Sequence, residues 1–473
     1  YIEKGEFPDT KRHFAVLRCN HCDDAPCIEI CPTVALFRRP DGIVDFDSEL
    51  CIGCKSCMQA CPYDALYIDP NTQTAAKCNF CAHRVEVGLE PACVIVCPVQ
   101  AIIAGDLDDP ASKISQIVAT QKVSMRKPEK GTKPKLFYVG VDGDLLQPTM
   151  IEPQSTYFWA EKHPGEDLYA LLKEKKEKPI PDAAREVYDV PHPQLWGRMI
   201  ASYLWTKSIA AGVLLVAAFL LNLGYQGETL LFNLVSPVLA LLFIGITIFL
   251  LIFDLKRPER FYYLLTKPNL KSWLVWGGYI LMLYGLLAVL WLFIGFASGS
   301  VPKVLYWSTA LFAVGSAGYS AFLFAQAKGR DLWQSPLFLW HLLAQAITAG
   351  TAILMISGAI FHADSSVMEV LGKILGGSLI FSLAMILGEV SFTHVSEDVK
   401  RATDLLKKGS LCGSFWGLVI GLGVLLPIIL LLWSGFQDGA TYIPSVSASV
   451  FALVGLWLFE DLWIKAGQAV PLS

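Results

Sequence analysis

The sequence predicts a small α+β domain rich in cysteine, followed by an all-α integral membrane bundle of eight transmembrane helices. Two observations predict this division. Twelve of the 13 cysteines lie before residue 98, whereas the chain beyond about residue 200 consists mostly of long apolar runs. A chain of 473 residues also exceeds the usual size of one domain. The net charge of −4 gives no reason to expect nucleic acid as a partner.

Three cysteine groups repeat a short spacing, and each group ends in Cys-Pro. The patterns are C-x2-C-x4-C-x3-C-P from Cys19, C-x2-C-x2-C-x3-C-P from Cys51 and C-x2-C-x11-C-x3-C-P from Cys78. A tight loop of this kind directs three thiolates at one cluster, while the fourth cysteine faces away toward another. Zinc ligands or disulfides are the alternatives, but a disulfide framework has no reason to repeat these spacings. The sequence therefore predicts a ferredoxin-like iron–sulfur domain.

The crossing of the fourth cysteine assigns two complete [4Fe–4S] clusters to the first two groups. A third and a fourth cluster then need cysteines that this sequence does not contain. The expected ligands are Cys19, Cys22, Cys27 and Cys61 for cluster A, Cys51, Cys54, Cys57 and Cys31 for cluster B, Cys78, Cys81 and Cys93 for cluster C, and Cys97 for a fourth cluster.

This region resembles the four-cluster electron-transfer subunits of molybdopterin oxidoreductases, such as those of dimethyl sulfoxide, polysulfide and nitrite reductase systems. In that family a further cysteine group precedes these three and pairs with the last one. The resemblance implies that the sequence, which opens "YIEKGEFPDTKRHFAVLRC", starts inside the domain, and that the full protein carries four clusters. A true three-group protein with only two or three clusters is the alternative.

Residues 141–197 are polar and proline-rich, and we expect them to connect the iron–sulfur domain, 1–140, to a membrane domain, 198–473. The connector includes a charged helical piece, "GEDLYALLKEKKEK", at 165–178. Eight later stretches reach the roughly 20 apolar residues that a membrane span needs. They lie near 198–223, 229–253, 271–297, 303–327, 335–361, 367–394, 411–435 and 442–465.

The distribution of Lys and Arg between the loops predicts the orientation. The loops on the side of the iron–sulfur domain carry twelve of them, and the opposite loops carry only Lys303 and Lys373. Because cytoplasmic loops are enriched in Lys and Arg, we expect the iron–sulfur domain on the cytoplasmic side of the inner membrane.

The membrane half resembles the NrfD/polysulfide reductase membrane subunit over roughly 195–473. The matching stretches are "DLKRPERF" (254–261), "KPNLKSWLVWG" (267–277) and "AGQAVPLS" (466–473). The two subunits are usually separate polypeptides, and here they are fused. The resemblance implies a quinone pocket under the iron–sulfur domain, walled by the first four membrane helices. It also places Tyr203 where relatives have a histidine. Arg257 and Arg260 are expected to anchor the membrane interface or to dock the iron–sulfur domain.

Ionisable side chains within membrane spans are costly and mark functional candidates. Those of this chain fall in the predicted cytoplasmic half, where quinone chemistry needs acid–base groups. Lys207 lies about 16 Å along its helix from Trp196, so it needs a carboxylate partner, a lowered pKa or a path to the interface. The candidates for quinone and proton chemistry are Tyr203, Lys207, Asp254, His341, Glu389 and Glu460, with Asp254 and Glu460 as candidate partners of Lys207.

Haem is not expected, because a membrane haem needs facing histidines. Only His341 lies well inside a span, whereas His362 and His394 lie near span ends. The expected cofactors are therefore [4Fe–4S] clusters, with menaquinone or ubiquinone as the membrane substrate.

These features predict a fused electron-transfer and quinone-binding membrane subunit of a quinone-linked oxidoreductase. The resemblance implies a separate molybdopterin catalytic subunit, with molybdenum or tungsten, and substrate catalysis is expected there. Because the buried ionisable groups lie on one side, we expect quinone protons to exchange with the cytoplasm. The alternatives are a redox-coupled ion-translocating or coupling subunit, as in alternative complex III, and a scaffold without turnover.

Overall fold

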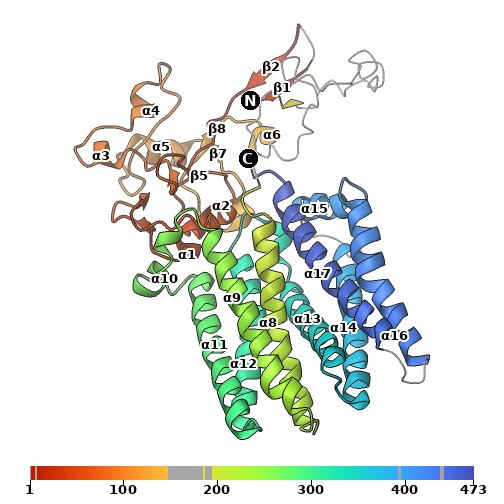
Figure 1. Cartoon of the computed structure of the whole chain (residues 1–473). Helices are drawn as coiled ribbons and strands as arrows, with labels where there is room; N and C mark the ends of the chain where they lie inside the picture. The colour runs from red at the N-terminus through yellow and green to blue at the C-terminus, as the bar shows by residue number, and fades with distance from the viewer. Residues whose placement is uncertain are drawn as a thin grey trace.

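The computed structural model describes residues 2–5, 8–146, 185–186, 194–391, 396–436 and 442–472. Most of the expected connector, including its helical piece at 165–178, lies outside the described residues, as does His394. Figure 1 shows the cysteine-rich domain seated on one end of a bundle of long helices. The α+β iron–sulfur domain followed by an all-α membrane bundle is therefore confirmed.

The first two cysteine groups fold as two copies of one unit, a short helix followed by an antiparallel hairpin. Each cysteine loop brings its first three thiols to one cavity, and the fourth cysteine, after the helix, lines the other cavity. The units are α1 (Pro26–Ile30) with β3 (Leu36–Arg38) and β4 (Val44–Phe46), and α2 (Ser56–Ala60) with β5 (Leu66–Ile68) and β6 (Ala75–Lys77).

Shorter elements complete the domain around these two units. A three-stranded antiparallel sheet has the order β2-β1-β9, and a two-stranded sheet pairs β7 with β8. Their bounds are β1 Ile2–Lys4, β2 Lys11–His13, β9 Arg185–Glu186, β7 Val123–Ser124, β8 Tyr138–Val139, α3 Ala82–Val85, α4 Ala92–Ile95, α5 Lys113–Thr120 and α6 Gly143–Leu146.

Eight helices in the described part of the chain are long and apolar enough to cross a membrane. Their number and order confirm the expected spans. They are α8 (Arg198–Asn222), η3 (Leu230–Val235) continued by α9 (Ser236–Phe253), α11 (Trp273–Ser298), α12 (Lys303–Ala325), α13 (Phe338–Ile360), α14 (Ser365–Ser391), η6 (Ser414–Leu425) continued by α16 (Leu426–Phe436), and α17 (Ile443–Ala469).

Helix α8 occupies the centre of the bundle. Its most apolar segment is 83% buried, against 28% for the corresponding segments of α9, α11 and α14. It packs against α9, α12, α13 and α17. The approach to α13 is very close, since a Cβ on Gly212 would lie 1.7 Å from the carbonyl oxygen of Ala346. Small residues allow such backbone contact between membrane helices, so polar side chains of α8 are shielded from lipid.

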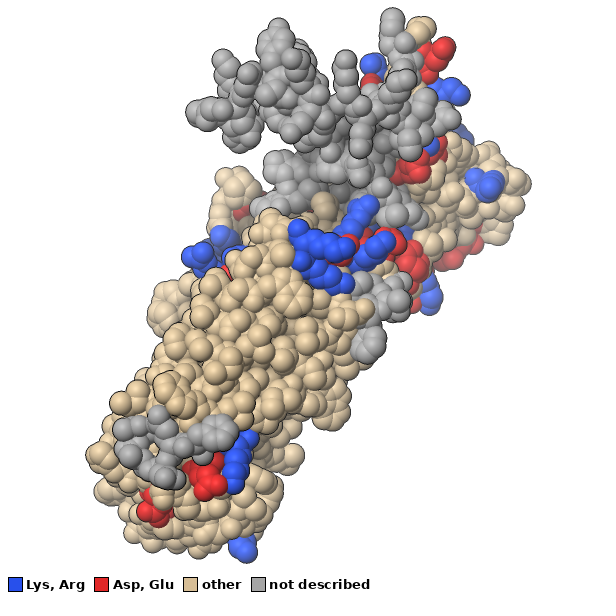
Figure 2. Space-filling model, turned by 90° about the vertical axis from the view of Figure 1, so that its right-hand side faces the viewer, with Lys and Arg blue, Asp and Glu red and all other residues tan. Residues whose placement is uncertain are grey.

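The surface of the bundle has the charge pattern of a membrane protein. Figure 2 shows a broad band of uncharged surface over the helices, with Lys, Arg, Asp and Glu gathered beyond its ends. The loops after α9 and α12, and the helix α15 (Glu397–Lys407), lie at the end that carries the iron–sulfur domain (Figure 1). The chain is therefore a multi-pass membrane protein, and the lysine- and arginine-rich loops share one side with the cysteines.

Candidate cluster sites and membrane junction

The first two cysteine groups surround two cavities in the iron–sulfur domain. Cavity A is lined by four cysteines and by side chains such as Val44 and Tyr63. Cavity B is lined by the other four and by Lys55. The cysteines are Cys19, Cys22, Cys27 and Cys61 around cavity A, and Cys31, Cys51, Cys54 and Cys57 around cavity B. These are the groups that the crossing rule predicts for clusters A and B.

The geometry fits clusters better than single metal ions or disulfides. All 13 cysteines lie among the described residues, and none forms a disulfide. In the same part of the chain, no three His, Cys, Asp or Glu side chains are close enough to hold one metal ion. Four cysteines lining one cavity suit a multi-iron cluster.

The thiols are also held as metal ligands need to be held. Burial raises the pKa of Cys22 to about 11 and that of Cys54 to about 12, and a coordinating metal ion would displace the thiol proton. The sulfur of Cys51 accepts hydrogen bonds from the backbone N–H groups of Gly53 and Ala75, both at 3.4 Å. Such N–H donors stabilise the negative charge of ligating sulfur.

The third cysteine group is more open. Its four cysteines are all partly exposed. The guanidinium of Arg18 donates to the sulfur of Cys93 at 3.0 Å, and the backbone N–H of Ala101 donates to that of Cys97 at 3.2 Å. The ligand sets of cluster C and of the fourth cluster stay predictions.

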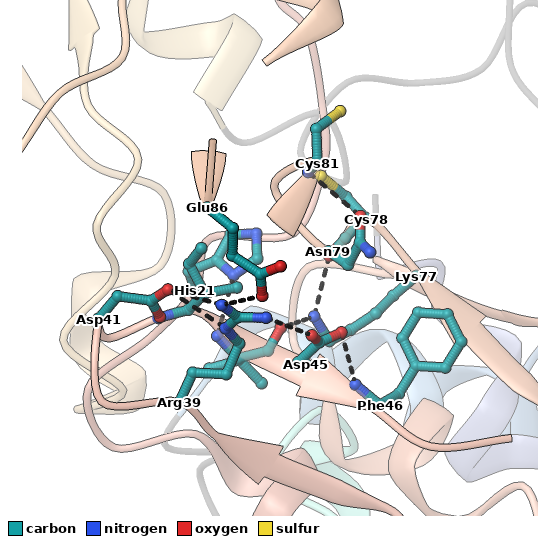
Figure 3. Close-up of polar contacts among 12 residues, drawn as sticks. His21, Arg39, Asp41, Asp45, Phe46, Lys77, Cys78, Asn79, Cys81 and Glu86 are labelled. Atoms are coloured by element: carbon teal, nitrogen blue, oxygen red, sulfur yellow. Dashed lines mark hydrogen bonds and ion pairs between the residues drawn. The ribbon is translucent and has the colours of Figure 1, made fainter. Parts of the chain in front are cut away.

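Charged side chains fill the space between the first and third groups (Figure 3). Lys77 is buried, and its ammonium donates to the carbonyl oxygens of Val44 and Cys78. The guanidinium of Arg39 instead binds three carboxylates closer to the surface. These are Asp41, Asp45 and Glu86, at 3.1, 3.6 and 2.6 Å.

The loops of the membrane domain bind the cysteine loops that line cavity B. Arg260 donates to the carbonyl oxygen of Cys51 at 3.0 Å, and Asn269 donates to that of Cys31 at 2.7 Å. The indole N–H of Trp196 donates to the carbonyl oxygen of Cys54 at 3.4 Å. Cavity B therefore faces the membrane domain, and the expected docking role of Arg260 is confirmed. Arg257 docks as well, to the carbonyl oxygen of Thr72 at 2.8 Å.

An ion pair also crosses this junction. The ammonium of Lys55, which lines cavity B, lies 2.9 Å from the carboxylate of Asp254 at the end of α9. Both side chains are largely buried, with 8% and 14% exposed. The expected pairing of Asp254 with Lys207 is wrong. The reason is positional, because Asp254 follows the last turn of α9 and meets the cysteine domain rather than the bundle interior.

Within the bundle, the ammonium of Lys207 lies between α8 and α12. It donates to the hydroxyl oxygen of Ser320 at 2.6 Å and to the carbonyl oxygen of Ala317 at 3.1 Å. It also lies 4.7 Å from the ring centre of Tyr319, within cation–π range. The hydroxyl of Tyr203 lies 3.4 Å from that of Ser320. Tyr203 and Lys207 are thus brought together through a serine that sequence analysis missed.

Glu460 on α17 is fully buried, but neither of its carboxylate oxygens has a hydrogen-bond partner among the described residues. The amide of the buried Gln345 on α13 is also without one. Lys207 is near enough to act electrostatically on Glu460, yet the two form no ion pair within 4.0 Å in this part of the chain. Glu460 therefore acts on Lys207 without a direct ion pair, and its role as the carboxylate partner of Lys207 stays a prediction.

The two remaining candidates lie elsewhere. The imidazole of His341 stacks on Phe459, with ring centres 4.6 Å apart, which is a packing contact between α13 and α17. Glu389 lies on α14, which packs on α13 and α16 rather than on α8. One carboxylate oxygen of Glu389 is buried without a described hydrogen-bond partner. The structure does not bring Glu389 to Tyr203 and Lys207.

A polar cluster at the junction was missed by sequence analysis. The side chain of Gln59, on α2, donates to the side-chain oxygen of Gln468 at 2.7 Å. Arg330, between α12 and α13, donates to Gln59 at 2.7 Å and to the carbonyl oxygen of Val470 at 2.9 Å. All three polar side chains are buried. Their separation in sequence left no local signal by which to find them.

Comparison with known protein families agrees with this architecture. Residues 187–471 match the family model described as polysulphide reductase, NrfD. That match covers more than half of the 473 residues. The chain belongs to the NrfD family. Residues 10–107 match a 4Fe–4S dicluster domain, so the NrfD domain is fused to a domain that carries [4Fe–4S] clusters.

Known relatives of the dicluster domain include subunits of reductases. The B subunit of tetrathionate reductase from Salmonella typhimurium is 48% identical over 145 residues, 30% of this chain and 58% of that protein. Protein NrfC of Escherichia coli is 49% identical over 138 residues, which are 29% of this chain and 62% of NrfC. The B component of polysulfide reductase from Wolinella succinogenes is 48% identical over 122 residues, which are 26% of this chain and 64% of that protein. The match thus spans about three fifths of the length of these relatives.

Proposed function

We propose that this chain passes electrons between a separate catalytic subunit and a quinone bound in the NrfD domain. The observation that carries the proposal is the junction at cavity B, where three membrane-domain side chains bind backbone carbonyls of the cysteine loops. Electron transfer into the membrane needs the last carrier held rigidly against the bundle. The buried cluster of Gln59, Arg330 and Gln468 supports such rigidity.

The ligand sets for clusters A and B are part of this proposal. Clusters bound there would supply carriers that accept and release one electron each. The protein contributes eight cysteines around two cavities, N–H donors to sulfur, and a low-polarity surrounding that includes Val44 and Leu66. Cluster C and the fourth cluster would extend the series of carriers toward the exposed surface of the domain, where a catalytic partner could dock.

The proposed quinone site lies between α8 and α12, near the end of the bundle that meets cavity B. Tyr203, Lys207 and Ser320 form one hydrogen-bonded group there. A hydroxyl and an ammonium can bind the carbonyl oxygens of a quinone, and Lys207 can stabilise the negative charge that builds up as the quinone is reduced. The substrate would be menaquinone or ubiquinone.

The catalytic partner is proposed from the relatives. Tetrathionate, polysulfide and arsenate reductases contain the subunits that the iron–sulfur domain resembles. We propose a molybdopterin subunit with molybdenum or tungsten, bound on the cytoplasmic side of the inner membrane. Purification in mild detergent from the native membrane, followed by molybdenum and tungsten analysis, tests the partner. Labelling of Lys303 and Lys373 from the outside of intact cells tests the orientation.

Quinone turnover provides the direct test. The purified full chain in liposomes is given reduced methyl viologen and a soluble quinone analogue. We expect quinone reduction that a hydroxyquinoline N-oxide blocks and that Tyr203→Phe and Ser320→Ala lower at least tenfold. Tyr67→Phe, which alters an exposed tyrosine, should leave the rate unchanged. If neither the inhibitor nor the two substitutions lower the rate of quinone reduction, the proposed quinone site is refuted.

One observation favours a second function, a redox-coupled ion-translocating or coupling subunit. Glu460 and Gln345 are neighbouring buried polar groups whose side chains make no close hydrogen bond among the described residues, and buried polar sites of this kind usually hold water. Hydrated groups deep in a bundle can carry protons. The two functions differ in charge movement. Turnover confined to protons of one side moves little charge across proteoliposomes, whereas ion translocation generates a membrane potential.

A further inference from the structure

Two buried lysines flank the two cysteine cavities, and their surroundings differ. Lys55 lines cavity B, and Lys77 lies beside cavity A, where its ammonium binds the carbonyl oxygen of the cavity residue Val44. The two lysines are 7% and 6% exposed. Since water screens neither charge fully, each lysine acts on its cavity over several ångströms.

The charge of Lys55 is opposed by a direct partner from the other domain. Its ammonium lies 2.9 Å from Asp254, and both side chains are largely buried. A pair this close has little net charge when seen from the cavity. The membrane domain therefore cancels most of the positive charge that the sequence "CKSC" places at cavity B.

The charge of Lys77 has no such partner among the described residues. Its ammonium donates to two backbone carbonyl oxygens, of Val44 and Cys78. The Lys77 ammonium is held beside cavity A, because Val44, whose carbonyl oxygen it binds, lines that cavity. An ammonium satisfied by neutral carbonyls keeps its full charge.

The acidic side chains grouped around Arg39 form no ion pair with Lys77 in the described part of the chain. Figure 3 shows Asp41, Asp45 and Glu86 grouped around Arg39. Asp41 and Glu86 have 38% and 54% of their side chains exposed, so solvent screens their fields more strongly than that of Lys77. The carboxylate of Asp45 is directed to Arg39 at 3.6 Å.

Reduction adds one negative charge to a cluster, so a nearby unopposed cation stabilises the reduced form and raises the reduction potential. We propose that Lys77 raises the potential of the cluster at cavity A, and that Asp254 lowers the potential of the cluster at cavity B by cancelling Lys55. Docking of the membrane domain thereby helps to set the energy of the electron that leaves for the quinone. The inference rests on the proposed ligand sets.

Potentiometric titration monitored by electron paramagnetic resonance tests this in the purified full chain. The resonance signal that is lost in Cys22→Ala is assigned to the cluster at cavity A. The signal that is lost in Cys57→Ala is assigned to the cluster at cavity B. Lys77→Met is expected to lower the midpoint potential of the cavity A signal and to leave that of the cavity B signal unchanged. Asp254→Asn is expected to raise that of the cavity B signal alone, and Lys55→Met to lower it. The double variant Lys55→Met/Asp254→Asn should return close to the wild-type potential.

Two controls sharpen the outcome. Lys113→Met removes an exposed lysine of the same domain and should shift neither potential, whereas Lys77→Arg keeps the charge and should retain the wild-type value. The proposal is overturned if neither signal moves, or if the double variant shifts as far as Asp254→Asn. If Lys77→Met loses iron while Lys77→Arg keeps a normal iron content, Lys77 is needed for cluster assembly. The proposed effect of Lys77 on the potential at cavity A is then overturned.

Iron and acid-labile sulfide in the wild-type chain separate this inference from the proposed function. If the wild-type chain contains no clusters, the proposed function is refuted. If the clusters form normally but their potentials do not change in these variants, only the inference is refuted.

Discussion

The side chain of Gln59 donates to that of Gln468 at 2.7 Å, although the two residues lie 409 positions apart in the sequence. Gln59 belongs to the short helix between two cysteines of the second group, and Gln468 lies at the end of the last membrane helix. The oxygen of Gln468 also accepts the backbone N–H groups of Leu195 and Trp196, both at 3.0 Å. One glutamine thus joins both domains and the start of α8.

Gln468→Leu should weaken this junction without emptying the cavities. Leucine has a similar size but leaves the side-chain N–H of Gln59 and the backbone N–H groups of Leu195 and Trp196 without their acceptor, which costs about 1–3 kcal/mol for each buried group. We expect a lower midpoint temperature for bleaching of the iron–sulfur absorbance, with normal iron content at low temperature. Gln121→Leu, at an exposed position, is the control. An unchanged midpoint would contradict the role of Gln468.

Cys57→Ala should remove one cluster. Cys57 lines cavity B, so its loss is expected to lower the iron content by about four atoms per chain. Cys412→Ala should change nothing, because Cys412 lies between α15 (Glu397–Lys407) and η6 and donates to the carbonyl oxygen of Lys407 at 2.9 Å. Iron and sulfide analysis measures both. Equal iron in the two variants would show that Cys57 is not a ligand.

Gly212→Ala should destabilise the bundle. The added Cβ would lie 1.7 Å from the carbonyl oxygen of Ala346, so α8 and α13 must move apart, at a cost of about 1–3 kcal/mol or more. The thermal midpoint of the purified chain in detergent should fall. Gly245→Ala meets nothing within 4 Å and should leave the midpoint equal or slightly higher. A similar midpoint for both variants would argue against the close helix contact.

Lys127→Met should reduce the pH dependence of stability in mild alkali. Burial lowers the pKa of Lys127 from 10.5 to about 8, and its ammonium donates to the carbonyl oxygen of Leu472 at 3.0 Å. At a pH between these two pKa values, Lys127 is protonated in the unfolded chain and deprotonated in the folded chain. Stability therefore rises with pH across this window, by at most about 1.4 kcal/mol per pH unit, and does not depend on Lys127 titration below it.

Thermal midpoints of the wild type, Lys127→Met and Lys122→Met at pH 7, 8, 9 and 10 measure this effect. The wild type should gain stability relative to Lys127→Met as the pH rises above 8. Lys122, which is exposed, serves as the control and should follow the wild type. Parallel curves for wild type and Lys127→Met would rule out the shifted lysine.

Glu460→Gln should lower quinone turnover without lowering the stability of the bundle. The amide keeps the shape of the side chain but removes a buried carboxylate that has no described hydrogen-bond partner, so the bundle should be as stable as the wild type or more stable. If Glu460 carries protons, quinone turnover should fall by about 10²-fold or more. Glu369→Gln, at an exposed ion pair with Lys373, should keep its rate. Normal turnover in Glu460→Gln would assign Glu460 no part in proton transfer.

Much of this architecture was predictable because its signals are local. The spacing of Cys19, Cys22 and Cys27 controls which thiols one loop can direct at one point, and the Cys-Pro step sends the fourth away. Eight apolar stretches predict eight spans because each span needs about 20 apolar residues. The docking of Arg260 was also expected, since the loops rich in Lys and Arg lie on the side of the cysteines.

The partners of buried charges were not predictable. Depth along a helix suggested that Lys207 needs a carboxylate, but helix rotation and the neighbouring backbone gave it Ser320 and the carbonyl of Ala317 instead. Asp254 was counted as a group of the membrane span, yet the end of α9 presents it to Lys55. Sequence analysis had assigned Lys55 no role.

The sequence by itself determined the two-part architecture, the cysteine groups and the number of membrane spans, since spacing and hydropathy act over a few turns of the polypeptide. Only the tertiary structure decided which cysteine cavity meets the membrane, that Asp254 pairs with Lys55, and that Gln59, Arg330 and Gln468 close the junction. Those contacts join segments hundreds of residues apart. Their geometry depends on how rigid helices pack, which no local pattern specifies.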